Sequence, residues 1–198
     1  MRKIPYVVIA FILLSCKSND NLVIDQKFER CINYRHSLQM DMYMTDTISV
    51  NANTEIKSNI FNYWENILLI DGHLEEVSKK AYSKLFVKIL EPGVLDSSLL
   101  KFKSEIEFDP SYLMEGYSVY IQNIGCIDYL YRHLGLIDEN DWRIKLFKIH
   151  DKIESVGNTD SNQFIIEMID AVPQKSFENI IYRRQFLYYI YRTAANTK

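Results

Sequence analysis

Apolar side chains recur every three or four residues along most of the chain after residue 24, which is the spacing of one buried face of an α-helix. Glycine or proline interrupts this pattern at short intervals, at Gly72, Pro92, Gly93, Pro110, Gly135, Gly157 and Pro173. Segments of this length and pattern bury their apolar stripes against one another. The sequence therefore predicts an all-α fold, a compact bundle of about seven short helices.

Four segments are the most informative for this prediction. Residues 112–134 are apolar on nearly every side, which is typical of a helix at the centre of a bundle. Residues 56–70 and 74–89 carry one stripe each, with the turn Asp71-Gly72 between them, and predict a helical hairpin. Residues 100–108 alternate apolar and charged side chains and fit either a helix or a strand, so both structures stay open there.

The first residues have a different pattern. Arg2 and Lys3 precede an uninterrupted apolar run over residues 4–14. That run is shorter than the roughly 20 residues of a membrane-spanning helix, and it matches the apolar core of an export signal. The sequence predicts a signal peptide over residues 1–15.

The end of this signal, Leu13-Leu14-Ser15-Cys16, resembles the lipobox of bacterial lipoproteins. The resemblance implies cleavage after Ser15 and attachment of fatty acyl chains, such as palmitate, to Cys16. Residues 16–23 are then the acylated cysteine and a short polar tether, and residues 24–198 are a single helical domain. The resemblance also implies a membrane-anchored protein of the cell envelope, facing the periplasm or the cell surface. Lys17, where an Asp signals inner-membrane retention, favours the outer membrane.

Composition narrows the range of partners. The chain has 198 residues, of which 47% are hydrophobic, and a net charge of -3, which suits one globular domain. Loss of Arg2 and Lys3 with the signal changes the net charge from -3 to -5. Nucleic-acid binding is not favoured because it needs a basic surface. An acidic domain is repelled by anionic lipid, so we expect the acyl anchor to hold it at the membrane.

Candidate chemistry is sparse. The HExxH, ExxH, CxxC and GxSxG motifs and the phosphate-binding loop do not occur in the sequence. The pair His150-Asp151 and the group His73, Glu75 and Glu76 fit solvated helix faces better than catalytic acid–base pairs. We therefore predict no catalytic site, no cofactor and no enzyme activity.

Three methionines near a histidine form a group of candidate metal ligands. Met40, Met42 and Met44 lie near His36, and thioether sulfur selects Cu(I). Alternate spacing places three side chains on one face only in an extended segment, whereas this segment fits a helix. Methionine as flexible core filler is the favoured interpretation, and no metal site is predicted.

Two cysteines remain once Cys16 is acylated. Cys31 and Cys126 are an even pair in an exported chain, which is the setting in which disulfides form. Both also lie in apolar helical patterns, where a free cysteine packs as a small hydrophobic residue. A disulfide and a pair of buried thiols both stay open.

The last predicted helix, from Ser176 to about Ala195, is rich in Tyr and Arg. Because these residues are enriched at interface hot spots, a partner surface at Tyr182, Arg183, Tyr189 and Arg192 is one hypothesis. A core helix whose hydroxyl groups reach the surface is the other. The function that follows is a membrane-anchored, non-enzymatic protein-binding or assembly lipoprotein. The alternative is a periplasmic immunity protein that neutralises a delivered toxin.

Overall fold

The computed structural model describes residues 21–38, 59–106, 110, 114, 123–156 and 161–196. Helices joined by loops make up these ranges, and none of the described residues forms a strand. The all-α fold predicted from the apolar spacing is confirmed. Cys16 and the three methionines near His36 lie outside the described residues.

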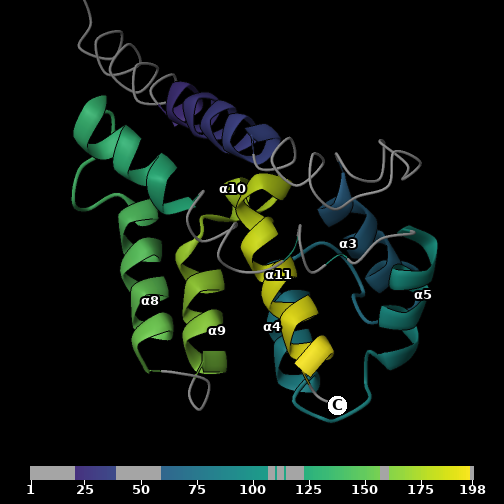
Figure 1. The fold of residues 1–198 in the computed structure, drawn as a ribbon. Helices are drawn as coiled ribbons and strands as arrows, with labels where there is room; N and C mark the ends of the chain where they lie inside the picture. The colour runs from purple at the N-terminus through teal and green to yellow at the C-terminus, as the bar shows by residue number, and fades with distance from the viewer. Residues whose placement is uncertain are drawn as a thin grey trace, which may run out of the picture.

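Helix α11, Ile180–Asn196, is the most enclosed element of the described chain. It runs through the middle of the molecule, drawn in yellow in Figure 1, and packs against α10 (Gln174–Phe177), α3 (Ile60–Ile70) and α5 (Asp96–Ile106). Apolar and polar side chains alike are buried along it: Ile181, Tyr182, Arg183, Gln185, Phe186, Leu187, Tyr188, Tyr189, Ile190, Tyr191 and Ala194. The centre of the bundle therefore belongs to the C-terminal helix.

The helix expected at the centre, near residues 112–134, is described continuously from residue 123. Residues 123–128 are α-helical and continue into the π-helical turn η1, Tyr129–His133. Cys126, Ile127 and Leu130 are buried, but Tyr129 is 41% exposed. This part of the helix lies at one edge of the molecule in Figure 1, so only some of its apolar side chains face the core.

Four helices flank α11 in two groups. In Figure 1, α8 (Trp142–Val156) and α9 (Ser161–Ala171) form an antiparallel pair on one side, and α3 and α5 lie on the other. Helix α4, Lys79–Lys88, packs mainly against α9. The predicted hairpin is therefore wrong, because the main packing partner of α4 is α9 and not α3. The two helices of the predicted hairpin touch through Tyr82 and Glu65.

The loop between α3 and α4 explains why these two helices do not form the predicted hairpin. Gly72 has a φ of +75°, a conformation that ends α3 and that glycine adopts without strain. The next helix does not start there, because Ser78 caps α4 by accepting a hydrogen bond from Ala81 N at 3.2 Å. The intervening loop gives α4 the freedom to turn toward α9.

The helix over residues 21–38, purple in Figure 1, lies across one end of α8, α9 and α11. Its buried side chains face the bundle: Ile24, Phe28, Ile32 and His36. Their spacing of four residues is the single-stripe pattern of a surface helix. Among the described helices, none combines the length and hydropathy that a membrane span requires.

The structure also settles two boundaries. Helix α5 runs to Ile106, so the described part of the ambiguous segment 100–108 is helical. The predicted C-terminal helix is divided into α10 and α11, and Asn179 Oδ1 accepts a hydrogen bond from Ile181 N at 3.0 Å at the start of the second. An asparagine that binds the first free N–H groups of a helix favours a new start at this point.

Candidate functional site

The partner surface predicted on the C-terminal helix is not at the surface. Tyr182, Arg183 and Tyr189 are only 3%, 6% and 4% exposed, and this part of the prediction is wrong. Arg192 is half-buried and its Nη1 lies 3.3 Å from Tyr188 Oη, to which it donates a hydrogen bond. Because α11 has neighbours on all sides, Tyr182, Arg183 and Tyr189 make hydrogen bonds inside the protein.

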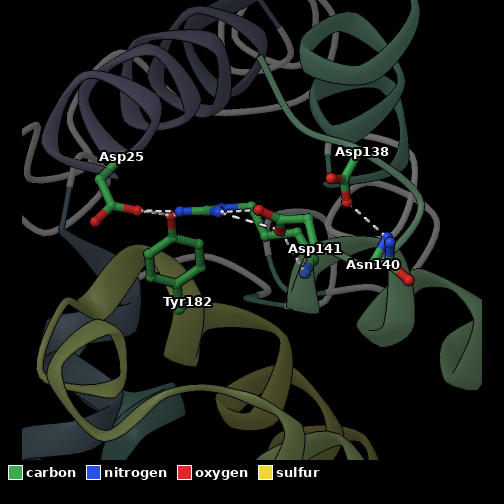
Figure 2. A network of polar contacts seen from close by, with 6 residues as sticks. Asp25, Asp138, Asn140, Asp141 and Tyr182 are labelled. Atoms are coloured by element: carbon green, nitrogen blue, oxygen red, sulfur yellow. Dashed lines mark hydrogen bonds and ion pairs between the residues drawn. The ribbon is translucent and has the colours of Figure 1, made fainter. Parts of the chain in front are cut away.

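One of these polar clusters surrounds Arg143, at the start of α8, and Figure 2 labels its partners Asp25, Asp141 and Tyr182. Its side chain is 2% exposed and forms ion pairs with Asp25 and with Asp141, the latter at 3.0 Å. Tyr182 Oη donates to Asp25 Oδ1 at 2.6 Å and accepts from Arg143 Nε at 3.1 Å. Burial raises the pKa of Tyr182 well above its ordinary value, so its hydroxyl keeps the proton that it donates. The cluster joins helix 21–38, α8 and α11.

A second buried cluster joins α3, α4 and α11. Arg183 donates to both carboxylate oxygens of Glu65, from Nε at 2.7 Å and from Nη2 at 2.9 Å. Its Nη1 donates to the carbonyl oxygen of Phe177 at 2.7 Å, and Tyr82 donates to Glu65 Oε1. Burial and the Glu65 carboxylate hold the pKa of Tyr82 well above its usual range. These hydrogen bonds offset the hydration that the buried charge pair loses, so the pair is part of the core.

Cys31 and Cys126 are joined by a disulfide in the structure, with their Cα atoms 5.7 Å apart. The bond connects helix 21–38 to the helix of residues 123–128. Of the two alternatives that the sequence left open, the structure contains the disulfide. It fastens the first described helix to the domain at a second point, besides Asp25.

Two histidines of the described chain, His150 and His36, are buried. His150 Nε2 lies 2.6 Å from Tyr189 Oη, and burial lowers the pKa of His150 to about 4. His36 is also buried, and burial, together with the nearby Arg184, lowers its pKa to about 4. Of the candidate acid–base group near His73, Glu75 forms an exposed ion pair with Lys84 at 3.1 Å. In the part of the chain that the structure describes, no three His, Cys, Asp or Glu side chains gather as a metal site.

One groove combines apolar walls with accessible charge. It lies between residues 123–133 and α8, has a volume of about 350 Å³, and is lined by Ile124, Ile127, Asp128, Tyr131, Arg132, Glu139, Ile144, Phe147 and Lys148. We call it the α8 groove. Ile124, Ile127 and Tyr131 fall in the segment that the sequence predicts as the central helix, so the groove was missed. The π-helical turn η1, which the sequence did not predict, widens the helix at the edge of the groove.

The charges around the α8 groove are of both signs. Arg132 Nε pairs with Asp128 Oδ1 at 2.8 Å, and Tyr131 Oη donates to Glu139 Oε1 at 3.2 Å. Lys148 is exposed at the groove. An apolar floor with a charged, solvated rim is the usual anatomy of a protein interface.

No family model, curated protein or solved structure matches the chain. The function is therefore inferred from the geometry alone.

Proposed function

We propose that this chain is a lipid-anchored lipoprotein of the cell envelope that binds another protein in the α8 groove and catalyses no reaction. The α8 groove is the observation that carries the proposal. Ile124, Tyr131 and Phe147 of its lining are partly exposed, whereas Ile127, Ile144 and the polar clusters around Arg143 and Arg183 are buried. Residues that serve as interface anchors, namely Tyr, Phe and Arg, occur in it as Tyr131, Phe147 and Arg132.

The volume of the α8 groove suits side chains of a partner. At about 350 Å³ it lies at the lower end of the range for ligand pockets. Charges of both signs at its rim favour a polypeptide over a uniformly charged ligand. The expected partner is therefore an envelope protein that inserts apolar side chains between residues 123–133 and α8.

Photo-crosslinking tests the groove directly. A photoreactive amino acid at Phe147 of the intact lipoprotein should crosslink to one envelope protein in cells. A photoreactive amino acid at Val87, which is 61% exposed on α4, is the matched control. Equal crosslinking from both positions, or none from Phe147, would contradict the proposed site.

A pair of charge substitutions gives the second test. Phe147→Glu should lower co-purification of the partner identified by crosslinking about tenfold or more, since a desolvated anchor is worth about 2 kcal/mol. Val87→Glu should leave recovery unchanged, and circular dichroism should show that both variants are folded. If the captured protein is a toxin from whose action this lipoprotein rescues cells, the immunity alternative replaces the assembly role.

The anchor has its own test. Cys16→Ala should leave the chain unprocessed or release it from the membrane fraction, and mass spectrometry of the wild type should show acyl chains on Cys16. Normal cleavage together with unchanged membrane fractionation of Cys16→Ala would argue against lipidation.

A further inference from the structure

The outward face of helix 21–38 carries a continuous stripe of apolar and basic side chains. Val23, Lys27, Arg30, Tyr34 and Leu38 follow one another at intervals of four, three, four and four residues, so they share one side of the helix. We call these five residues the outer stripe. It is turned away from the bundle, because Phe28, Ile32 and the other inward residues occupy the opposite side.

The apolar members of the outer stripe are unusually accessible. Tyr34 is 65% exposed, and Val23 and Leu38 are 44% exposed each. Tyr129 from the neighbouring helix extends the stripe around a hollow of about 600 Å³ that Cys31 and Arg35 also line. An apolar patch of this kind on a soluble domain marks a surface that contacts something else.

The charge of this face is positive although the chain as a whole is acidic. Among the residues that the structure describes, Lys27, Arg30 and Arg35 form no ion pair. Two nearby acidic residues of the described chain are paired with arginine, and a third faces another pocket. Asp25 pairs with Arg143, Asp128 pairs with Arg132, and Glu29 lies beside Arg184 in a separate pocket. This face therefore attracts anions.

Helix 21–38 is held rigidly enough to present the stripe in a fixed direction. The Cys31–Cys126 disulfide and the pairing of Asp25 with Arg143 fasten it, and the Phe28 ring stacks on that of Tyr182 with 5.1 Å between centroids. The stripe and the domain therefore move as one body.

We propose that the outer stripe is a membrane-contact surface that lies on the anionic headgroup layer of the bilayer. The proposal rests on the proposed lipid anchor, because Val23 follows Cys16 by seven residues and an extended chain of that length reaches about 25 Å at most. A helix with basic residues beside Tyr, Val and Leu lies in the plane of the interface, where anionic lipid attracts its charges. The acyl chains then hold the domain at the bilayer, and the stripe decides which face it turns toward the lipid.

Tryptophan fluorescence in reconstituted vesicles tests this orientation. Tyr34→Trp is made in the intact lipoprotein, and Leu100→Trp is the matched control because Leu100 is 63% exposed on α5. Vesicles contain phosphatidylcholine and phosphatidylglycerol with brominated acyl chains as quenchers. The emission added by Trp at position 34 should be quenched several-fold more strongly than the emission added at position 100. Equal quenching at the two positions, with the protein still on the vesicles, would overturn the proposal.

Charge reversal separates lipid contact from burial against a protein. Lys27→Glu with Arg30→Glu, added to Tyr34→Trp, should lower the quenching, because each basic side chain at an anionic surface contributes about fivefold to partitioning. Lys80→Glu with Lys88→Glu, the same charge change on the exposed side of α4, should not lower it. Quenching that is unaffected by lipid charge, by 0.5 M salt (about a 4 Å screening length) and by the stripe variant would also overturn the proposal.

The outcome also distinguishes failure of the anchor. Mass spectrometry reports whether Cys16 is acylated in the same preparation. If it is not, the protein is mixed with an excess of anionic vesicles, and quenching at position 34 that salt reverses still supports the stripe. Loss of all quenching under those conditions would reject it. Crosslinking of the stripe to a protein in place of quenching by lipid would reject it as well.

Discussion

Helix α11 and helix 21–38 use similar residues for opposite purposes. Both carry arginine and tyrosine among apolar side chains. On α11, Arg183 and Tyr189 are 6% and 4% exposed, whereas on helix 21–38 Tyr34 is 65% exposed and Arg30 is also exposed. The number of neighbouring elements decides between the two roles: α11 is enclosed, while helix 21–38 is covered on one side only.

The energetic consequences differ as well. A charge inside the bundle is tolerated only when several hydrogen bonds compensate for lost hydration, as they do for Arg183 and Arg143. A charge on the outer stripe stays hydrated and contributes little to the stability of the domain. Substitutions on α11 should therefore change folding, and substitutions on the stripe should change only what the domain contacts.

The largest effect should come from removing the carboxylate that neutralises α11. Glu65→Leu leaves the Arg183 guanidinium buried without its ion-pair partner, and we expect the free energy of unfolding to fall by about 4 kcal/mol in urea titrations. Glu75→Leu makes the same replacement in the exposed pair with Lys84 and should cost less than about 1 kcal/mol. Similar losses in both variants would show that burial does not distinguish the two sites.

A double variant sharpens this prediction. Glu65→Leu with Arg183→Leu removes both charges together, so it should be more stable than Glu65→Leu alone. If the double variant were the less stable of the two, the loss would come from packing of Arg183 and not from its unpaired charge.

The fold class was predictable because apolar spacing reports secondary structure directly. Gly157, one of the breaks in the apolar pattern, comes directly after α8, which runs from Trp142 to Val156. Which helices pack together was less predictable, because a stripe shows that a face is buried without naming the partner. The pairing of α4 with α9 therefore differs from the predicted hairpin.

The sites were harder to predict than the fold, since their residues come from distant parts of the chain. Asp25, Arg143 and Tyr182 meet only in the folded protein, and spacing gives no sign of it. One signal was available: Glu65 is the one charged residue in the segment Ile60–Ile70, and a charge that becomes buried needs a partner. The outer stripe was missed for the opposite reason, because Val23, Tyr34 and Leu38 look like core residues until the inward face of their helix is known.

The second effect concerns the bond that holds helix 21–38. Cys31→Ser with Cys126→Ser opens a loop whose ends are 95 residues apart, and we expect the free energy of unfolding to fall by about 3 kcal/mol. Hydrogen exchange should show that residues 21–38 lose more protection than α11. Two thiols that react with an alkylating agent in denatured, unreduced wild-type protein would contradict the bond.

The third effect is a pH dependence that arises from buried histidine. The folded-state pKa of His150 is about 4, below the ordinary 6.5, so the unfolded chain binds a proton that the folded chain excludes. Its contribution is fully present above about pH 6.5 and is lost as the pH falls toward 4, by about 3 kcal/mol at most. His36 titrates in the same direction with the same pKa.

His150→Gln separates the two histidines. The variant should reduce the slope of unfolding free energy between pH 6.5 and pH 4, measured by urea titration, while His36 keeps the remainder. A slope equal to that of the wild type would mean that His150 binds its proton as readily in the folded protein as in the unfolded chain.

The smallest effect compares one tyrosine from each helix. Tyr182→Phe removes the hydroxyl that donates to Asp25 at 2.6 Å and accepts from Arg143, and we expect a loss of about 2 kcal/mol because both partners are charged. Tyr34→Phe removes a hydroxyl from a side chain that is 65% exposed and should change the free energy of unfolding by less than about 0.5 kcal/mol. Both replacements keep the aromatic ring, so the difference isolates the hydroxyl group. Equal effects in urea titrations would mean that the tyrosine on helix 21–38 is as enclosed as the one on α11, and the contrast between the two helices would fail.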